Sequence, residues 1–121
     1  MAIIQNKRKT GNYYETLACE YLQKQGVIII ERNFRVKSGE IDIVGKDKDT
    51  FIFVEVKYRK NSLMGNPYEA VTYNKKKTIC RVAVMYKQIK KLPDNGSFRF
   101  DVISILDNEI TWYKNAFPYI P

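Results

Sequence analysis

Four charged residues lie in two neighbouring segments that are otherwise apolar and rich in β-branched and aromatic residues. The first segment carries Glu40 and Asp42, and the second carries Glu55 and Lys57. Side chains alternate across a strand, so the two members of each pair share one face. If the segments pair as a hairpin, three carboxylates and one ammonium group converge on one patch. Burying such charges without partners or a metal is costly, so the pattern indicates a chemical site.

The residue types in this patch suit a hard divalent cation. Asp42 and Glu55 offer the carboxylate oxygens that Mg²⁺ or Mn²⁺ prefers. Such an ion lowers the pKa of a bound water and polarises a phosphate, and Lys57 would orient the water or offset charge on phosphorus. A partly solvated Glu55–Lys57 salt bridge is the alternative. Glu40 begins its segment and Glu15 borders the apolar face of a predicted helix, so both are candidates for which a solvated role stays open.

Composition removes several other chemistries. The chain of 121 residues contains no histidine, which excludes Ser-His-Asp and Cys-His catalysis. Two cysteines without histidine cannot form a usual zinc site, and we expect Cys19 and Cys80 to be reduced and buried. The first residues lack the pattern of a signal peptide, and no apolar run reaches the roughly 20 residues that cross a bilayer. We therefore expect a cytoplasmic protein that does not contact membranes.

The formal net charge of +8 suggests a polyanionic partner, with nucleic acid first and a membrane surface or acidic protein behind it. Lysines that begin a predicted helix oppose the helix dipole, so helix stability does not explain the run at 75–77. A solvated helix face is the alternative to a role in holding a phosphate backbone. The candidate nucleic-acid-binding residues are Arg59, Lys60, Lys75, Lys76 and Lys77.

The elements that must position these residues follow the order helix, three strands, helix, two strands. We expect residues 1–9 to form a flexible basic arm and residues 10–121 a single domain. The first three strands can form an antiparallel meander, and the second helix then returns the chain parallel to the sheet. The result is an α/β fold with a mixed five-stranded sheet flanked by helices. The expected elements are a helix over 10–25, strands over 27–36, 40–44 and 51–58, a helical turn over 67–71, a helix over 73–91, and strands over 98–106 and 110–113.

This arrangement resembles the PD-(D/E)XK nuclease superfamily, with Asp42 on one strand and Glu55-Val56-Lys57 on the next. It is closer to the YraN-like bacterial branch, which is similar to archaeal Holliday-junction resolvases. The chain departs from that branch at Tyr14, where glycine is usual. The other matching residues are Gly11, Glu15, Ala18, Tyr21, Leu22, Gly26, Arg32, Asn33, Arg35, Gly39, Glu40, Ile41, Phe53, Val54, Arg59, Gly65, Pro67, Glu69, Ala70, Val71, Lys75, Arg99, Phe100, Asp101, Val102, Asn115, Ala116 and Phe117.

The resemblance implies a restriction-endonuclease-like core and a Mg²⁺ or Mn²⁺ site. The ligands that it implies are Asp42, Glu55, the carbonyl of Val56 and a glutamate from the first helix, at Glu15. It also implies that Lys57 is the catalytic lysine. A Mg²⁺-dependent, endonuclease-like protein acting on DNA is therefore the expected function, with branched or damaged DNA among the candidate substrates.

Two alternatives remain open. One is a non-catalytic nucleic-acid-binding module that retains the nuclease fold, and the other is an interaction protein whose charge keeps it soluble. A two-fold junction substrate would favour a homodimer, although the sequence identifies no interface.

Overall fold

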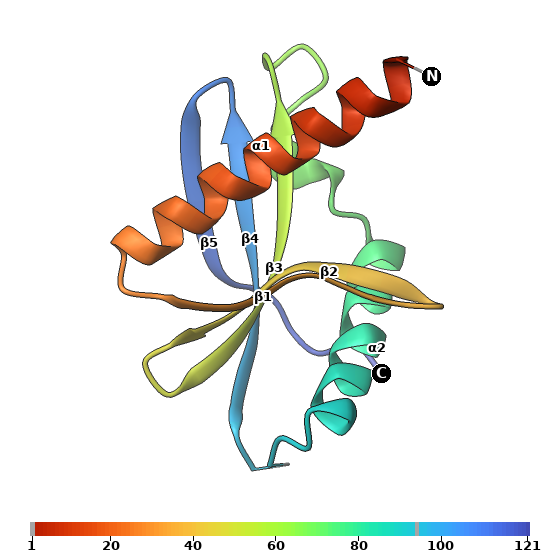
Figure 1. Cartoon of the computed structure of the whole chain (residues 1–121), viewed down its shortest axis with the longest axis vertical. Helices are drawn as coiled ribbons and strands as arrows, with labels where there is room; N and C mark the ends of the chain where they lie inside the picture. The colour runs from red at the N-terminus through yellow and green to blue at the C-terminus, as the bar shows by residue number, and fades with distance from the viewer. Residues whose placement is uncertain (1, 94) are drawn as a thin grey trace.

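In the part of the chain that the computed structural model describes, residues 2–93 and 95–121, a mixed five-stranded sheet carries an α-helix on each face (Figure 1). The strand order is β1-β2-β3-β4-β5, with β3 and β4 parallel and the other neighbours antiparallel. This confirms the expected α/β fold. The elements are α1 (Ala2–Lys24), β1 (Ile28–Val36), β2 (Gly39–Asp47), β3 (Thr50–Arg59), the 3₁₀ helix η1 (Pro67–Ala70), α2 (Tyr73–Ile89), β4 (Ser97–Leu106) and β5 (Glu109–Phe117).

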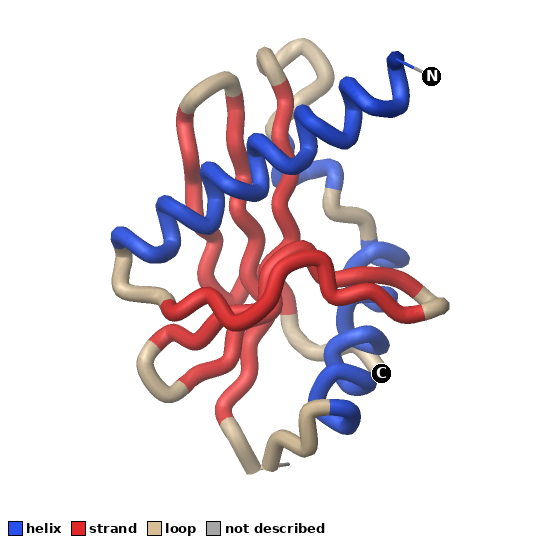
Figure 2. Tube along the Cα trace, viewed as in Figure 1, coloured by secondary structure: helices blue, strands red, loops and turns tan. Residues whose placement is uncertain are grey.

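The alternation of side chains along β3 explains why each face of the sheet has its own helix. Ile52 and Val54 point to one face and pack in the apolar cluster that contains Leu22 of α1. Phe53 points to the other face and packs with Tyr86 of α2. A strand that is apolar on both faces must be covered twice, so α1 crosses one side of the sheet and α2 lies on the other (Figure 2).

Capping residues fix the path from β3 into α2. The Asn66 side chain accepts a hydrogen bond from the backbone N–H of Tyr68 at 2.9 Å, and Pro67 occupies the first position of η1. The Thr72 hydroxyl accepts a hydrogen bond from the N–H of Lys75 at 3.2 Å, which begins α2. Each cap satisfies a backbone donor that has no partner within its helix.

The first helix is longer than expected. It begins at Ala2, so residues 2–9 are helical and do not form the flexible arm that we expected; Met1 lies outside the described residues. Ala, Gln, Lys and Arg are good helix formers, and extending an existing helix is far easier than starting one. Even at this length α1 is not apolar enough to cross a bilayer, nor is any other described helix.

One further expectation needed correction near the C-terminus. Strand β5 continues past Tyr113 to Phe117, although Asn115 adopts a left-handed conformation with φ of 51°. The N–H of Asn115 donates to Asp101 Oδ1 at 2.9 Å, and this bond to a buried carboxylate holds the strand beyond the kink.

The β1–β2 hairpin turns from one face of the sheet to the other. Ile41 and Ile43 are two residues apart and would share a face in a regular strand. Ile41 instead packs in the cluster under α2, and Ile43 packs in the cluster under α1. Phe34 of β1, paired with Ile41, also lies on the α2 side. The hairpin therefore changes face beside Asp42, and this turn creates the corner in which the candidate site lies.

Candidate active site

Asp42 lies where the pairing between β2 and β3 ends. The two strands pair from Asp47 opposite Thr50 to Ile43 opposite Val54, and no further pairs follow in their described residues. At the next step Asp42 Oδ2 accepts a hydrogen bond from the N–H of Val56 at 2.8 Å. The Asp42 carboxylate thus accepts from a backbone N–H of β3 that would otherwise bond to a backbone carbonyl of the neighbouring strand. This bond brings Asp42 onto the part of β3 that carries Glu55.

Asp42 and Glu55 form a buried acid pair, with 7% and 4% of the residue exposed. Burial, followed by the charge of Glu55, raises the pKa of Asp42 to about 8. The pKa of Glu55 is also raised, and burial is again the main cause. Two carboxylates in a dry corner cannot both ionise cheaply. Burial and the neighbouring carboxylate therefore favour the protonated form of Asp42 in the metal-free site.

Two lysines from different elements face the same oxygen of this pair. Lys57 Nζ of β3 lies 3.7 Å from Glu55 Oε1, and Lys75 Nζ of α2 lies 3.9 Å from it. Both charges lower the pKa of Glu55, and Lys75 has the larger effect. Lys75 was predicted only as a nucleic-acid-binding residue. Its place beside Glu55 makes it part of the acid cluster as well.

Glu15 reaches the site from α1. Burial raises its pKa, and the charge of Asp42 raises it further. Arg32 Nη2 lies 3.7 Å from Glu15 Oε1, an oxygen that is buried without a hydrogen-bond partner. A hydrogen bond with the Asn33 side chain opposes these effects and lowers the pKa. Glu15 is thus a half-buried carboxylate on α1 whose pKa responds to the charge of Asp42 on β2.

Glu40 has a separate partner. It stands opposite Arg35 in the β1–β2 ladder, and Arg35 Nε and Nη2 each lie 2.9 Å from Glu40 Oε2. Neighbouring opposite charges on one sheet face commonly pair in this way. The structure therefore shows Glu40 in a cross-strand ion pair at the edge of the site.

The acid pair has the donor set of a hard-cation site, although it is incomplete by itself. Among residues 2–93 and 95–121, no three His, Cys, Asp or Glu side chains are grouped so that they could hold a metal ion. Glu55 Oε2 is, however, buried without a hydrogen-bond partner. The N–H of Val56 points to Asp42, and in an extended strand the carbonyl of the same residue faces the same neighbour. Two carboxylates and one carbonyl suit Mg²⁺, which retains several waters.

The predicted nucleic-acid-binding residues do not form one surface. Lys75 joins the acid cluster, whereas Lys76 Nζ lies over the ring of Phe117 at 5.6 Å from its centroid. Lys77 lines a separate hollow at the C-terminal end of the chain. Lys60 is exposed in the loop after β3, and Arg59 is half-buried, with an Nε that has no hydrogen-bond partner. The lysine run at the start of α2 thus divides between different environments.

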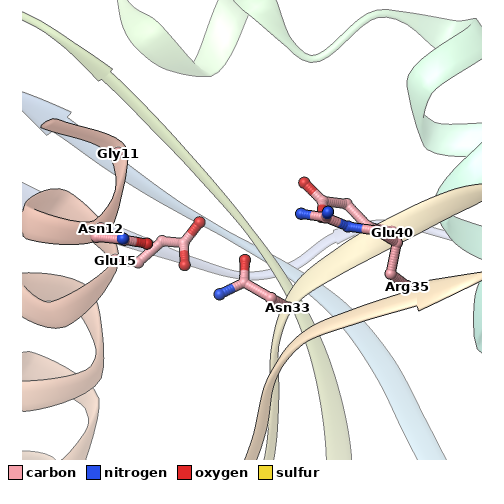
Figure 3. A pocket seen from close by; sticks show the side chains of 6 residues that line it. All are labelled: Gly11, Asn12, Glu15, Asn33, Arg35 and Glu40. Atoms are coloured by element: carbon pink, nitrogen blue, oxygen red, sulfur yellow. The ribbon is translucent and has the colours of Figure 1, made fainter. Parts of the chain in front are cut away.

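A cavity of about 690 Å³ opens between α1 and the β1–β2 hairpin (Figure 3). Glu15 enters it from the helix, and Asn33 reaches toward Glu15 from the hairpin. Sequence reasoning assigned no role to Asn33, although an asparagine within a strand is unusual enough to have been a signal. The cavity is lined by Gly11, Asn12, Glu15, Asn33, Arg35 and Glu40.

Comparisons with known proteins agree on one family. Residues 14–105 match the family model described as uncharacterised protein family UPF0102. A UPF0102 protein of Aliivibrio fischeri (strain ATCC 700601 / ES114) is 44% identical over 115 residues, which cover 93% of this chain and 94% of the relative. One from Lachnoclostridium phytofermentans is 45% identical over 112 residues, covering 93% and 95%. One from Clostridium botulinum (strain Loch Maree / Type A3) is 42% identical over 113 residues, covering 88% and 92%. The chain therefore belongs to the UPF0102 family, the YraN-like family that its residues resemble.

Proposed function

We propose that this chain is a Mg²⁺-dependent, endonuclease-like protein that hydrolyses phosphodiester bonds in DNA, with branched or damaged DNA among the candidate substrates. The observation that carries the proposal is the buried Asp42–Glu55 pair at the end of the β2–β3 ladder, with Lys57 and Lys75 beside it. If Asp42 and Glu55 had no function, we would expect apolar residues at these buried positions, because buried acids lower the stability of the fold. The net charge of +8 further supports a polyanionic substrate.

In this proposal, Asp42, Glu55 and the carbonyl of Val56 would hold the ion, and Glu15 would complete the set from α1. When bound, Mg²⁺ would supply a water of lowered pKa and an electrophile for a phosphate oxygen. Asp42 and Glu55 would both have to be ionised to hold the ion, so the proton that burial favours on Asp42 would be released. Lys57 donates from Nζ, either to the attacking water or to a phosphate oxygen whose charge grows during attack.

The lysine on α2 has a related role in the proposal. Lys75 approaches Glu55 from the side opposite to α1, since α1 and α2 pack on different faces of the sheet. With Glu55 engaged as a ligand, the Lys75 ammonium group would be attracted less strongly to that carboxylate. It would then be available to contact a phosphate next to the bond that is cleaved. Lys57 and Lys75 thus serve as charge partners of the empty acid pair and as phosphate contacts of the loaded one.

A second candidate is a DNA-binding module that retains the nuclease fold without turnover. The observation that favours it is the lack of a three-ligand metal group among the described residues. Such a module would bind DNA with a strong dependence on salt, and neither Mg²⁺ nor Mn²⁺ would change the affinity.

A panel of fluorescent DNA substrates separates the two candidates. Duplex, single-stranded and four-way-junction DNA are incubated with the protein in Mg²⁺, Mn²⁺ or EDTA. The wild type should cleave at least one substrate with a divalent ion only, and Glu55→Ala should abolish cleavage. The matched control Glu109→Ala removes an exposed glutamate at the start of β5 and should cleave as the wild type does. Binding without cleavage of any substrate would reject the enzyme and favour the module.

A further inference from the structure

Asn33 has an unusual backbone for a residue within a strand. Its φ is 54°, in the left-handed region that non-glycine residues rarely adopt. Of the described non-glycine residues with positive φ, Lys48, Lys91 and Asp107 lie in turns, whereas Asn33 and Asn115 lie inside strands. The kink at Asn115 is explained by its bond to Asp101. The kink at Asn33 needs another explanation, since such strain is characteristic of functional sites.

The position of Asn33 in the ladder supplies part of that explanation. Arg32 pairs with Ile43 and Phe34 pairs with Ile41, so Asn33 stands opposite Asp42. This is the point at which the hairpin changes from the α1 face of the sheet to the α2 face. Asparagine tolerates the left-handed conformation better than most residues. The kink therefore turns the hairpin beside the acid that accepts the Val56 N–H.

The side chain of Asn33 supplies the other part. It lines the cavity between α1 and the hairpin and reaches toward Glu15 (Figure 3). The Asn33 side chain lowers the pKa of Glu15, which is the effect of an amide N–H that donates toward an ionised carboxylate. Glu15 sits on a helix and Asp42 on a strand, and Asn33 lies between them, with its backbone opposite Asp42 and its side chain toward Glu15. Neighbours that orient a ligating carboxylate in this way typically affect metal sites strongly.

We propose that Asn33 is a positioning residue: its left-handed backbone turns the β1–β2 hairpin at Asp42, and its side-chain amide holds the Glu15 carboxylate over the acid pair. The role in metal binding rests on the proposed function, whereas the role in orienting Glu15 does not. Asn33 acts through Glu15. Deleting the Asn33 amide should therefore not weaken metal binding further in a protein whose Glu15 carboxylate has already been replaced.

The test uses two variants that separate the backbone from the amide. Asn33→Gly keeps the left-handed conformation without strain and deletes the amide, whereas Asn33→Ala loses both. Asn33→Gly should unfold thermally at the wild-type temperature or close to it, and Asn33→Ala should unfold at a lower one. By calorimetric titration with Mn²⁺, Asn33→Gly should bind about tenfold more weakly than the wild type. The matched control Asn115→Gly makes the same change at the other left-handed asparagine and should bind as the wild type does.

A double-variant cycle then tests whether the effect passes through Glu15. Glu15→Gln should weaken Mn²⁺ binding by a similar factor, and Asn33→Gly combined with Glu15→Gln should be no weaker than Glu15→Gln alone. Wild-type affinity in Asn33→Gly, or additive losses in the double variant, would overturn the metal-binding role.

A readout without metal tests the contact itself. The side-chain NH₂ signals of Asn33 in a ¹H–¹⁵N spectrum should shift in Glu15→Gln and stay in place in the control Glu40→Gln. Asn33 NH₂ signals that do not shift in Glu15→Gln would overturn the inference. If the wild type binds no Mn²⁺, the proposed function fails, and the NH₂ signals alone decide whether Asn33 positions Glu15.

Discussion

Replacing Asp42 with asparagine should make the metal-free protein more stable at alkaline pH. The folded pKa of Asp42 is about 8, against an ordinary value of 3.8. A carboxyl group whose pKa is raised by folding stabilises the protein below its unfolded pKa, and this contribution is lost as the pH rises through the folded pKa. Between pH 5 and 8 the unfolded group ionises throughout, whereas the folded group ionises only near pH 8. At about 1.36 kcal/mol for each tenfold change in the proton equilibrium, the wild type loses about 3.5 kcal/mol over this range.

Asparagine cannot ionise, so the free energy of unfolding of Asp42→Asn does not fall with pH for this reason. Urea unfolding in EDTA at pH 5, 6.5 and 8 measures the free energy of unfolding of both proteins, and the difference between them should grow by about 3.5 kcal/mol in favour of Asp42→Asn. Titrating groups that do not interact with Asp42 are shared by the two proteins and cancel, whereas Glu15 and Glu55 respond to Asp42, so the difference reports on the acid cluster as a whole. The control Asp107→Asn changes an exposed carboxylate in the β4–β5 turn, and its difference from the wild type should not grow with pH. A constant difference for Asp42→Asn, or one that favours the wild type at pH 8, would refute the buried acid pair.

Three further outcomes follow from the structure. Lys75→Met should bind Mn²⁺ about threefold more tightly than the wild type by calorimetry, because Lys75 stabilises the metal-free acid pair. The control Lys77→Met changes a residue that lines a different hollow and should bind Mn²⁺ as the wild type does. Equal Mn²⁺ affinities for Lys75→Met and the wild type would contradict the contact between Lys75 and Glu55. Gly11→Ala should raise the free energy of unfolding in urea by about 0.5–1 kcal/mol, because no atom lies within 4 Å of the added Cβ; a loss of stability would show that α1 is strained there. Phe53→Ala should cost about 3–5 kcal/mol in the same assay, since Phe53 is 1% exposed among three aromatic rings.

Local signals determined the elements and the identity of the main site residues. Alternating apolar residues located β3 with Glu55 and Lys57 on one face, and the helices were found because capping and helical periodicity depend on residues close together in the sequence. The length of α1 was harder to predict from the sequence. Residues 2–9 contain no residue that ends a helix, so the helix that packs through Leu22 continues back to Ala2. Asp42 and Glu55 could be placed on adjacent strands for the same local reasons.

The geometry of the site required the tertiary structure. Pairing of β2 with β3 ends at Ile43 because the hairpin changes face at Asn33, and an alternating pattern does not reveal a kink at a residue that is not glycine. The approach of Lys75 to Glu55 depends on how the crossover lays α2 against the sheet, and the pairing of Glu40 with Arg35 depends on strand register. The sequence by itself determined which charges the two strands carry, since side-chain alternation is a local property. Only the folded chain decided which of those charges meet, because that depends on contacts between residues far apart along the chain.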